Sequence, residues 1–142
     1  IAGGQYLDLS YEHKKVTEKK IIDMEIKKTG KLFSFCCVAP LILKNKSKKE
    51  IKKFEDIGAD IGLLFQVADD LIDHRGNFLI AGKKTGKDIK KGKATLISLL
   101  GYKNTIKYGN SLIFKINNKI KKYGSKSQNL SQTLNYILNR NK

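Results

Sequence analysis

The sequence predicts an all-α fold. Apolar residues recur at intervals of three and four along most of the 142 residues, as one face of a helix requires. No segment alternates apolar and polar residues convincingly enough to predict a β-strand. Pro40 is the single proline, so long stretches are free to be helical. With 40% hydrophobic and 30% charged residues, the composition is that of one ordinary globular domain rather than of a disordered segment.

Three helices are predicted in the first third of the chain. Residues 1–9 have the pattern of a helix end, and Thr17 is the predicted N-cap of a second helix with apolar residues at helical spacing. Gly30 permits a break or bend before an apolar helix that runs to Leu43. Residues 32–43 are too few to cross a bilayer, which needs about 20 residues, so they are expected to form a buried core helix.

Residues 49–73 carry the strongest helical pattern. Its repeated apolar positions are Ile51, Phe54, Ile57, Ile61, Leu64 and Ala68. From residue 74 to residue 93 the pattern changes to glycine and lysine, which predicts a flexible loop. Further helices are expected at residues 95–100, 104–122 and 130–138.

The chain is strongly basic, with a formal net charge of +16. Of its 29 basic residues only Arg75 and Arg140 are arginine, whereas nucleic-acid sites favour the planar, bidentate guanidinium. A solvated lysine-rich surface is therefore expected, and no nucleic-acid partner. Cys36 and Cys37 are adjacent and build no disulfide framework, which suits a cytoplasmic protein.

An aspartate-rich motif carries the most informative chemistry. Asp69, Asp70 and Asp73 lie in an otherwise apolar helix, where Asp69 and Asp73 are one turn apart and Gln66 shares their face. Gathered carboxylates are costly among apolar neighbours unless a cation compensates them. Mg²⁺ fits, because it takes oxygen ligands and is usually held by one or two carboxylates plus substrate phosphates. The alternative from this pattern alone is three exposed aspartates near a helix end.

The glycine-rich loop after this motif strengthens the metal hypothesis. Lys83 and Lys93 place ammonium groups on backbone that glycines make adaptable, just beyond the aspartates. A metal with lysines nearby suits a diphosphate ligand. Lysines 84, 87, 90 and 91 are more simply explained as a solvated surface.

These motifs, taken in order, resemble the second half of the trans-isoprenyl (polyprenyl) diphosphate synthases, in particular the farnesyl diphosphate synthases of bacteria. The resemblance spans nearly the whole chain and includes its last residues, 136–142. It rests on Gly3-Gly4-Gln5 with Asp8, Lys28-Thr29-Gly30, Phe65-Gln66 with Asp69-Asp70-Leu71-Ile72-Asp73, Gly82-Lys83 with Gly86-Lys87-Asp88, and Lys93-Ala94-Thr95.

The resemblance implies an all-α isoprenoid synthase bundle and a Mg-dependent, head-to-tail condensation of isopentenyl diphosphate with an allylic diphosphate. Three Mg ions and a homodimer are expected in the complete enzyme. The implied metal ligands are Asp69, Asp70, Asp73 and Asp88, the last through water. The implied catalytic residues are Lys28, Thr29, Gln66, Asp69 and Lys83. The substrate-binding residues that it implies are Lys28, Thr29, Gln66, Lys83, Lys93, Gln5, Asp8 and Arg140.

One departure from the family is large. Residues 69–73 hold the only Asp cluster in the chain, whereas the family also has a first Asp-rich motif in an amino-terminal half. The expectation is therefore that residues 1–142 are the carboxyl-terminal part of one polyprenyl synthetase domain, inactive by itself. Farnesyl diphosphate is the expected product. A geranylgeranyl or longer-chain synthase and a non-catalytic subunit of a heteromeric synthase remain the alternatives.

Overall fold

Helices make up nearly all of the structure, a computed structural model that describes residues 1–81 and 93–140, with the side chains of residues 77–81 excepted. The α-helices are α1 (Ala2–Ser10), α2 (Glu18–Glu25), α3 (Lys31–Leu43), α4 (Lys48–Ala81), α5 (Leu96–Leu100), α6 (Tyr102–Ile120) and α7 (Gln128–Asn139). A π-helical segment, η1 (Ile26–Gly30), joins α2 to α3, and a 3₁₀ segment, η2 (Lys121–Ser127), joins α6 to α7. No strand occurs in the described ranges, so the all-α prediction is confirmed.

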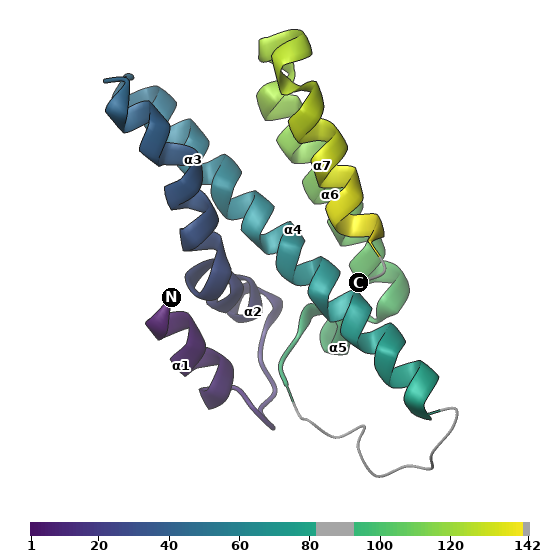
Figure 1. Cartoon of the computed structure of the whole chain (residues 1–142). Coiled ribbons are helices and arrows are strands. Elements are labelled where there is room, and N and C mark those ends of the chain that lie inside the picture. The colour runs from purple at the N-terminus through teal and green to yellow at the C-terminus, as the bar shows by residue number, and fades with distance from the viewer. Residues whose placement is uncertain (82–92, 141–142) are drawn as a thin grey trace.

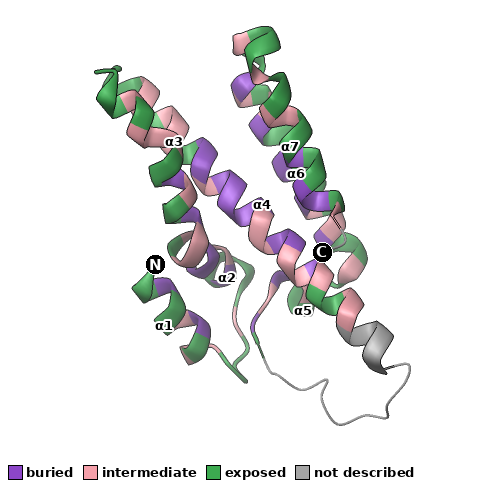
Figure 2. Ribbon diagram, viewed as in Figure 1, coloured by how far each residue is buried: buried purple, intermediate pink, exposed green. Residues whose placement is uncertain are grey.

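Helix α4 is the central element, and Figure 1 shows it running diagonally between α3 on one side and the α6–α7 pair on the other. Its buried residues include Ile57, Leu64 and Leu71, which pack with Ile116 of α6 and Leu134 of α7 in one core. Figure 2 shows the buried residues concentrated along the middle of α4 and on the inner sides of α6 and α7.

Glycines bring two segments unusually close to their neighbours. A Cβ atom on Gly62 of α4 would lie 2.6 Å from the Cα atom of Gly30, and one on Gly4 of α1 would lie 2.2 Å from the backbone nitrogen of Lys28. Atoms cannot approach so closely without displacement, so only glycine permits this packing. As a result, η1 is held tightly between α1 and α4.

The break or bend that Gly30 permits takes the form of an irregular but continuous π-helical turn that ends at Gly30. Two other sequence expectations need correction. Helix α4 does not end at residue 73 but continues to Ala81, where the sequence suggested a loop. Two contacts stabilise its later turns: the Arg75 Nε donates a hydrogen bond to the Tyr102 hydroxyl at 3.0 Å, and the His74 ring stacks on Tyr102.

The second correction concerns residues 32–43, which do not form a buried core helix. Ser34 is the only buried residue of α3, while Phe35 is 66% exposed and Leu43 is 82% exposed. The segment is apolar on all sides, and periodicity alone could not show that only one side meets α4. Its outer face has no cover among the described residues.

Candidate functional site

The aspartate motif lies within α4 rather than at its end. Asp69 and Asp73 are one helical turn apart, and Asp70 is only partly exposed beside them. Since the helix continues to Ala81, these carboxylates do not meet the negative end of the helix dipole. The motif therefore presents its carboxylates from a rigid support.

The π-helical turn places Lys28 and Thr29 opposite this face of α4. The Thr29 hydroxyl donates a hydrogen bond to the Gln66 Oε1 atom at 2.8 Å, 37 residues apart in sequence. Thr29 and Gln66 are thus brought together, as their shared assignment to one site predicted. Single π-helical turns are rare and often occur at functional sites, because the widened turn frees backbone groups from regular bonding.

Lys28 is paired with Asp8 of α1. Its Nζ donates to the Asp8 Oδ2 atom at 2.7 Å, and both side chains are largely buried. Burial lowers the pKa of Lys28, but the hydrogen bond and charge of Asp8 outweigh it and raise the pKa above its usual value. Lys28 is therefore a permanent positive charge. The close approach of α1 at Gly4 is what brings Asp8 within its reach.

Arg140, just after α7, reaches the aspartate motif from the other side. Its guanidinium donates to the Asp69 Oδ1 atom and lies 4.3 Å from the centroid of the Phe65 ring. The cation thus sits between a carboxylate and an aromatic face. The sequence placed Arg140 among the substrate-binding residues, but gave no sign that it would contact Asp69.

Two carboxyl groups of the motif, Asp69 and Asp70, have raised pKa values. Burial and, next, the negative charge of Asp73 raise the pKa of Asp70 to about 7, while the positive charge of Lys28 opposes this rise. Burial likewise raises the pKa of Asp69, although Arg140 counteracts it. Groups perturbed by burial and by like charges often mark functional sites.

Glu25, at the end of α2, is a further member of this site that sequence reasoning missed. It is 3% exposed, and its Oε2 atom has no hydrogen-bond partner among the described residues. Burial, followed by the Asp70 charge, raises the pKa of Glu25 to about 7, while Lys28 and Lys93 pull it down. The only sign of this role in the sequence is that Glu25 lies among apolar residues at helical spacing. That pattern does not show which acidic residue of the helix is buried.

The other predicted residues are less closely assembled. Gln5 is exposed on α1. Lys93 is exposed too, although its charge acts on Glu25. Lys83 and Asp88 lie outside the described residues.

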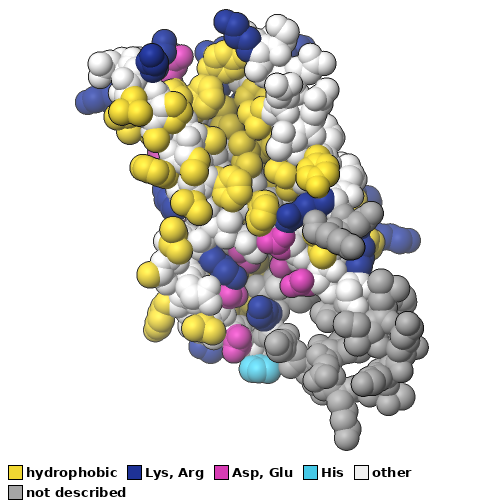
Figure 3. Space-filling view, viewed as in Figure 1, with side chains coloured by type: hydrophobic (Ala, Val, Ile, Leu, Met, Phe, Trp, Pro, Cys, Tyr) yellow, Lys and Arg dark blue, Asp and Glu magenta, His cyan; other side chains and the backbone are white. Residues whose placement is uncertain are grey.

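The acidic groups suit a Mg²⁺ ion that is held partly by protein carboxylates and partly by water and phosphate oxygens. Among the described residues, no three acidic, His or Cys side chains converge closely enough to hold a metal by themselves. Mg²⁺ does not need such a cage, because it keeps several waters and binds through one or two carboxylates plus phosphate oxygens. Asp69, Asp70 and Asp73 supply the carboxylates, and Lys28 supplies an adjacent cation for a phosphate. Figure 3 shows acidic and basic side chains gathered together on this face.

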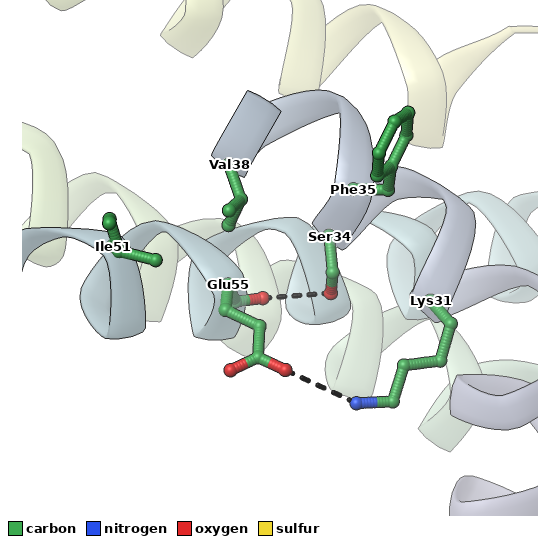
Figure 4. A pocket seen from close by; sticks show the side chains of 6 residues that line it. All are labelled: Lys31, Ser34, Phe35, Val38, Ile51 and Glu55. Carbon is green, nitrogen blue, oxygen red and sulfur yellow. Dashed lines mark hydrogen bonds and ion pairs between the residues drawn. The ribbon is translucent and has the colours of Figure 1, made fainter. Parts of the chain in front are cut away.

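A separate hollow of about 220 Å³ lies between α3 and α4. Figure 4 shows its six lining residues, among them the Lys31–Glu55 ion pair at 3.3 Å and the Ser34 hydroxyl, which donates to the Glu55 carbonyl oxygen at 2.9 Å. None of the predicted site residues lines it. No described helix is both long and apolar enough to span a membrane.

Comparisons with known proteins agree with this geometry. A family model described as polyprenyl synthetase matches residues 1–137. The chain is 34% identical over 139 residues to a farnesyl diphosphate synthase of Micrococcus luteus, covering 98% of this chain and 48% of that protein. It is 32% identical over 142 residues to a geranylgeranyl diphosphate synthase of Cyanophora paradoxa, covering 99% and 47%.

A solved structure gives the same result in three dimensions. The crystal structure of a Helicobacter pylori geranyltransferase complexed with magnesium and isoprenyl diphosphate superimposes with a TM-score of 0.72 at 25% identity, over 98% of this chain and 46% of that one. The chain spans about half the length of the relatives it matches. The bundle expected from the resemblance is confirmed, and the chain belongs to the polyprenyl synthetase family.

Proposed function

We propose that this chain is the carboxyl-terminal half of a Mg-dependent short-chain prenyltransferase that condenses isopentenyl diphosphate with dimethylallyl or geranyl diphosphate to give farnesyl diphosphate. The observation that carries the proposal is the convergence of α1, η1 and α4. It places the Lys28 ammonium within electrostatic reach of the Asp70 carboxylate, with the Thr29–Gln66 hydrogen bond alongside. Carboxylates and a buried lysine at one place suit a metal-complexed diphosphate.

Each residue has a defined task in this proposal. Asp69, Asp70 and Asp73 bind Mg²⁺, with Asp88 as a further ligand through water. The bound metal supplies positive charge that stabilises the departing diphosphate. Lys28 and Lys83 stabilise the same charge directly, and a well-placed group of this kind is commonly worth about 3–4 kcal/mol in the transition state.

Thr29 and Gln66 face the allylic carbon in this proposal. Their oxygen atoms can stabilise the positive charge that develops there when the carbon–oxygen bond breaks. The hydrogen bond between them fixes both side chains, so neither needs to reorganise during the reaction. Asp8 holds Lys28 in place through the 2.7 Å contact. Lys93, Gln5 and Arg140 complete the substrate-binding surface.

This chain spans about half the length of its relatives, so the proposed function belongs to the complete protein. The first Asp-rich motif of the family would come from an amino-terminal half, so the 142 residues are proposed to be inactive alone. A homodimer in the cytoplasm is proposed for the complete protein. A geranylgeranyl product is the second candidate, because relatives at 32–34% identity include synthases of both products.

Product analysis of the full-length protein tests the proposal. Incubation with both diphosphates and Mg²⁺ is expected to yield farnesyl diphosphate, and EDTA is expected to abolish it. Asp69→Ala should lower kcat by about 100-fold or more without loss of helicity. Asp56→Ala, in an exposed ion pair on the same helix, is the matched control and should leave turnover unchanged. Normal turnover in Asp69→Ala would exclude the assigned role.

A further inference from the structure

Glu25 is a buried acid to which the proposed function gives no task. It is the last residue of α2, where Ile21 and Met24 are also buried, and it is only 3% exposed. Its Oε2 atom has no hydrogen-bond partner in the part of the chain that the structure describes. A buried carboxyl group without a partner lowers stability, and native folds rarely keep one. A role in the site explains why an acid occupies this position.

The position of Glu25 connects it to the candidate site. Helix α2 contacts α1, η1 and α4, which are the three elements that converge there. Glu25 directly precedes the π-helical turn and lies three residues before Lys28. The charges of Asp70, Lys28 and Asp8 all act on its carboxyl group. Glu25 is therefore a buried neighbour of the residues assigned to the metal and the diphosphate.

The charges around Glu25 leave room for a divalent cation. The Lys28 ammonium donates its hydrogen bond to Asp8, at 2.7 Å, and so leaves the Oε2 atom of Glu25 without a donor. Lys93 acts on Glu25 only from an exposed position. When ionised, Asp8, Glu25 and Asp70 carry three negative charges. Lys28 balances one of them, and the remaining two match the charge of one divalent cation.

A water bound to that cation suits the vacant Oε2 atom. Mg²⁺ keeps several of its waters when it binds carboxylates and phosphate oxygens. We propose that Glu25 is a positioning residue of the metal–diphosphate site, whose carboxylate supports a divalent cation at Asp70 by accepting a hydrogen bond from one of its waters. This inference rests on the proposed function, which places Mg²⁺ at Asp70.

The Mg²⁺ dependence of pyrophosphate binding tests this role. Isothermal titration of the full-length protein with inorganic pyrophosphate, at about pH 8 and over a series of Mg²⁺ concentrations, gives the concentration needed for half-maximal binding. Glu25→Gln keeps the size of the side chain and removes its negative charge. It should raise the required Mg²⁺ concentration by about 10-fold or more, as the loss of an outer-shell partner of a metal commonly does. Glu25→Met, which suits the apolar neighbours, should have the same effect.

Stability measurements separate a positioning role from a structural one. In EDTA at about pH 8, urea unfolding should show both Glu25 variants to be at least as stable as the wild type, because the unpartnered acid is gone. Mg²⁺ with pyrophosphate should raise the urea midpoint of the wild type, and should raise that of Glu25→Gln much less at the same concentrations. Asp23→Asn, in an exposed ion pair on the same helix, is the matched control and should follow the wild type in both measurements.

An unchanged Mg²⁺ requirement in Glu25→Gln and Glu25→Met would overturn the inference. If both variants were also less stable than the wild type in EDTA, Glu25 would be a structural acid instead.

Asp69→Ala distinguishes this failure from failure of the proposed function. Loss of Mg-dependent binding in Asp69→Ala, with normal binding in both Glu25 variants, would leave the function standing and exclude the role of Glu25. Pyrophosphate binding by the wild type that does not require Mg²⁺ would exclude both.

Discussion

Glu25 should make the stability of the protein depend on pH in an unusual direction. Its carboxyl group is buried, its Oε2 atom has no hydrogen-bond partner in the described part of the chain, and burial is the main cause that raises its pKa from 4.5 to about 7. The folded state therefore keeps this proton to a higher pH than the unfolded state does. The stabilising contribution is complete below about pH 4.5 and is lost as the pH rises through about 7.

The size of the effect follows from the two pKa values. A rise from 4.5 to about 7 corresponds to roughly 3 kcal/mol of unfolding free energy, as an upper limit. Asp70, Asp8, Lys28 and Lys93 all act on Glu25, so part of the effect is shared with them. Glu25→Gln keeps the shape of the protonated acid and cannot lose the proton. We expect this variant to match the wild type near pH 5 and to exceed it by about 1–2 kcal/mol near pH 8.

Urea unfolding of the full-length protein in EDTA, at about pH 5, 6.5 and 8, measures this difference. Asp23→Asn is the control, because Asp23 lies on the same helix in an exposed ion pair with Lys27. Its stability should follow the wild type at every pH. If the wild type and Glu25→Gln lost stability in parallel as the pH rose, Glu25 would not be the buried, protonated acid inferred here.

Three further substitutions test the packing that supports the site. Thr29→Val removes the hydrogen bond to α4 and should lower the free energy of unfolding in urea by about 1 kcal/mol. It should also change kcat more than KM, and an unchanged kcat would show that Thr29 has no role in the reaction. Asp60→Asn removes a buried carboxylate that pairs with two lysines of α6 at 2.7 Å each, and should lower the free energy of unfolding by about 1–3 kcal/mol. An unchanged free energy of unfolding would show that these ion pairs between α4 and α6 do not stabilise the fold. Gly4→Ala would place a methyl group 2.2 Å from the Lys28 backbone nitrogen, so it should displace α1 and cost about 1–3 kcal/mol, and a fully stable variant would contradict the close approach.

The local helical pattern predicted most of the fold. The period of the apolar residues gave α4, α6 and α7 to within a few residues, except at the carboxyl end of α4. That end was missed because Gly76 weakens the helical pattern there. The contacts of Arg75 and His74 are with Tyr102, which lies in a distant segment of the sequence. Local sequence cannot reveal support of this kind.

The site could be predicted only in part, for a similar reason. Spacing on one helix placed Gln66 with Asp69 and Asp73, and the irregularity near Gly30 became the π-helical turn that carries Lys28 and Thr29. The pairing of Arg140 with Asp69 depends on how α7 returns to α4, which no local pattern encodes.

Mg-dependent binding of inorganic pyrophosphate to the full-length protein tests the central claim most directly. Isothermal titration should show binding that requires Mg²⁺ and that weakens by about 100-fold in Asp69→Ala and in Lys28→Ala. Equal binding by the wild type and both variants, or undiminished binding in EDTA, would show that α4 and the π-helical turn do not form a metal–diphosphate site.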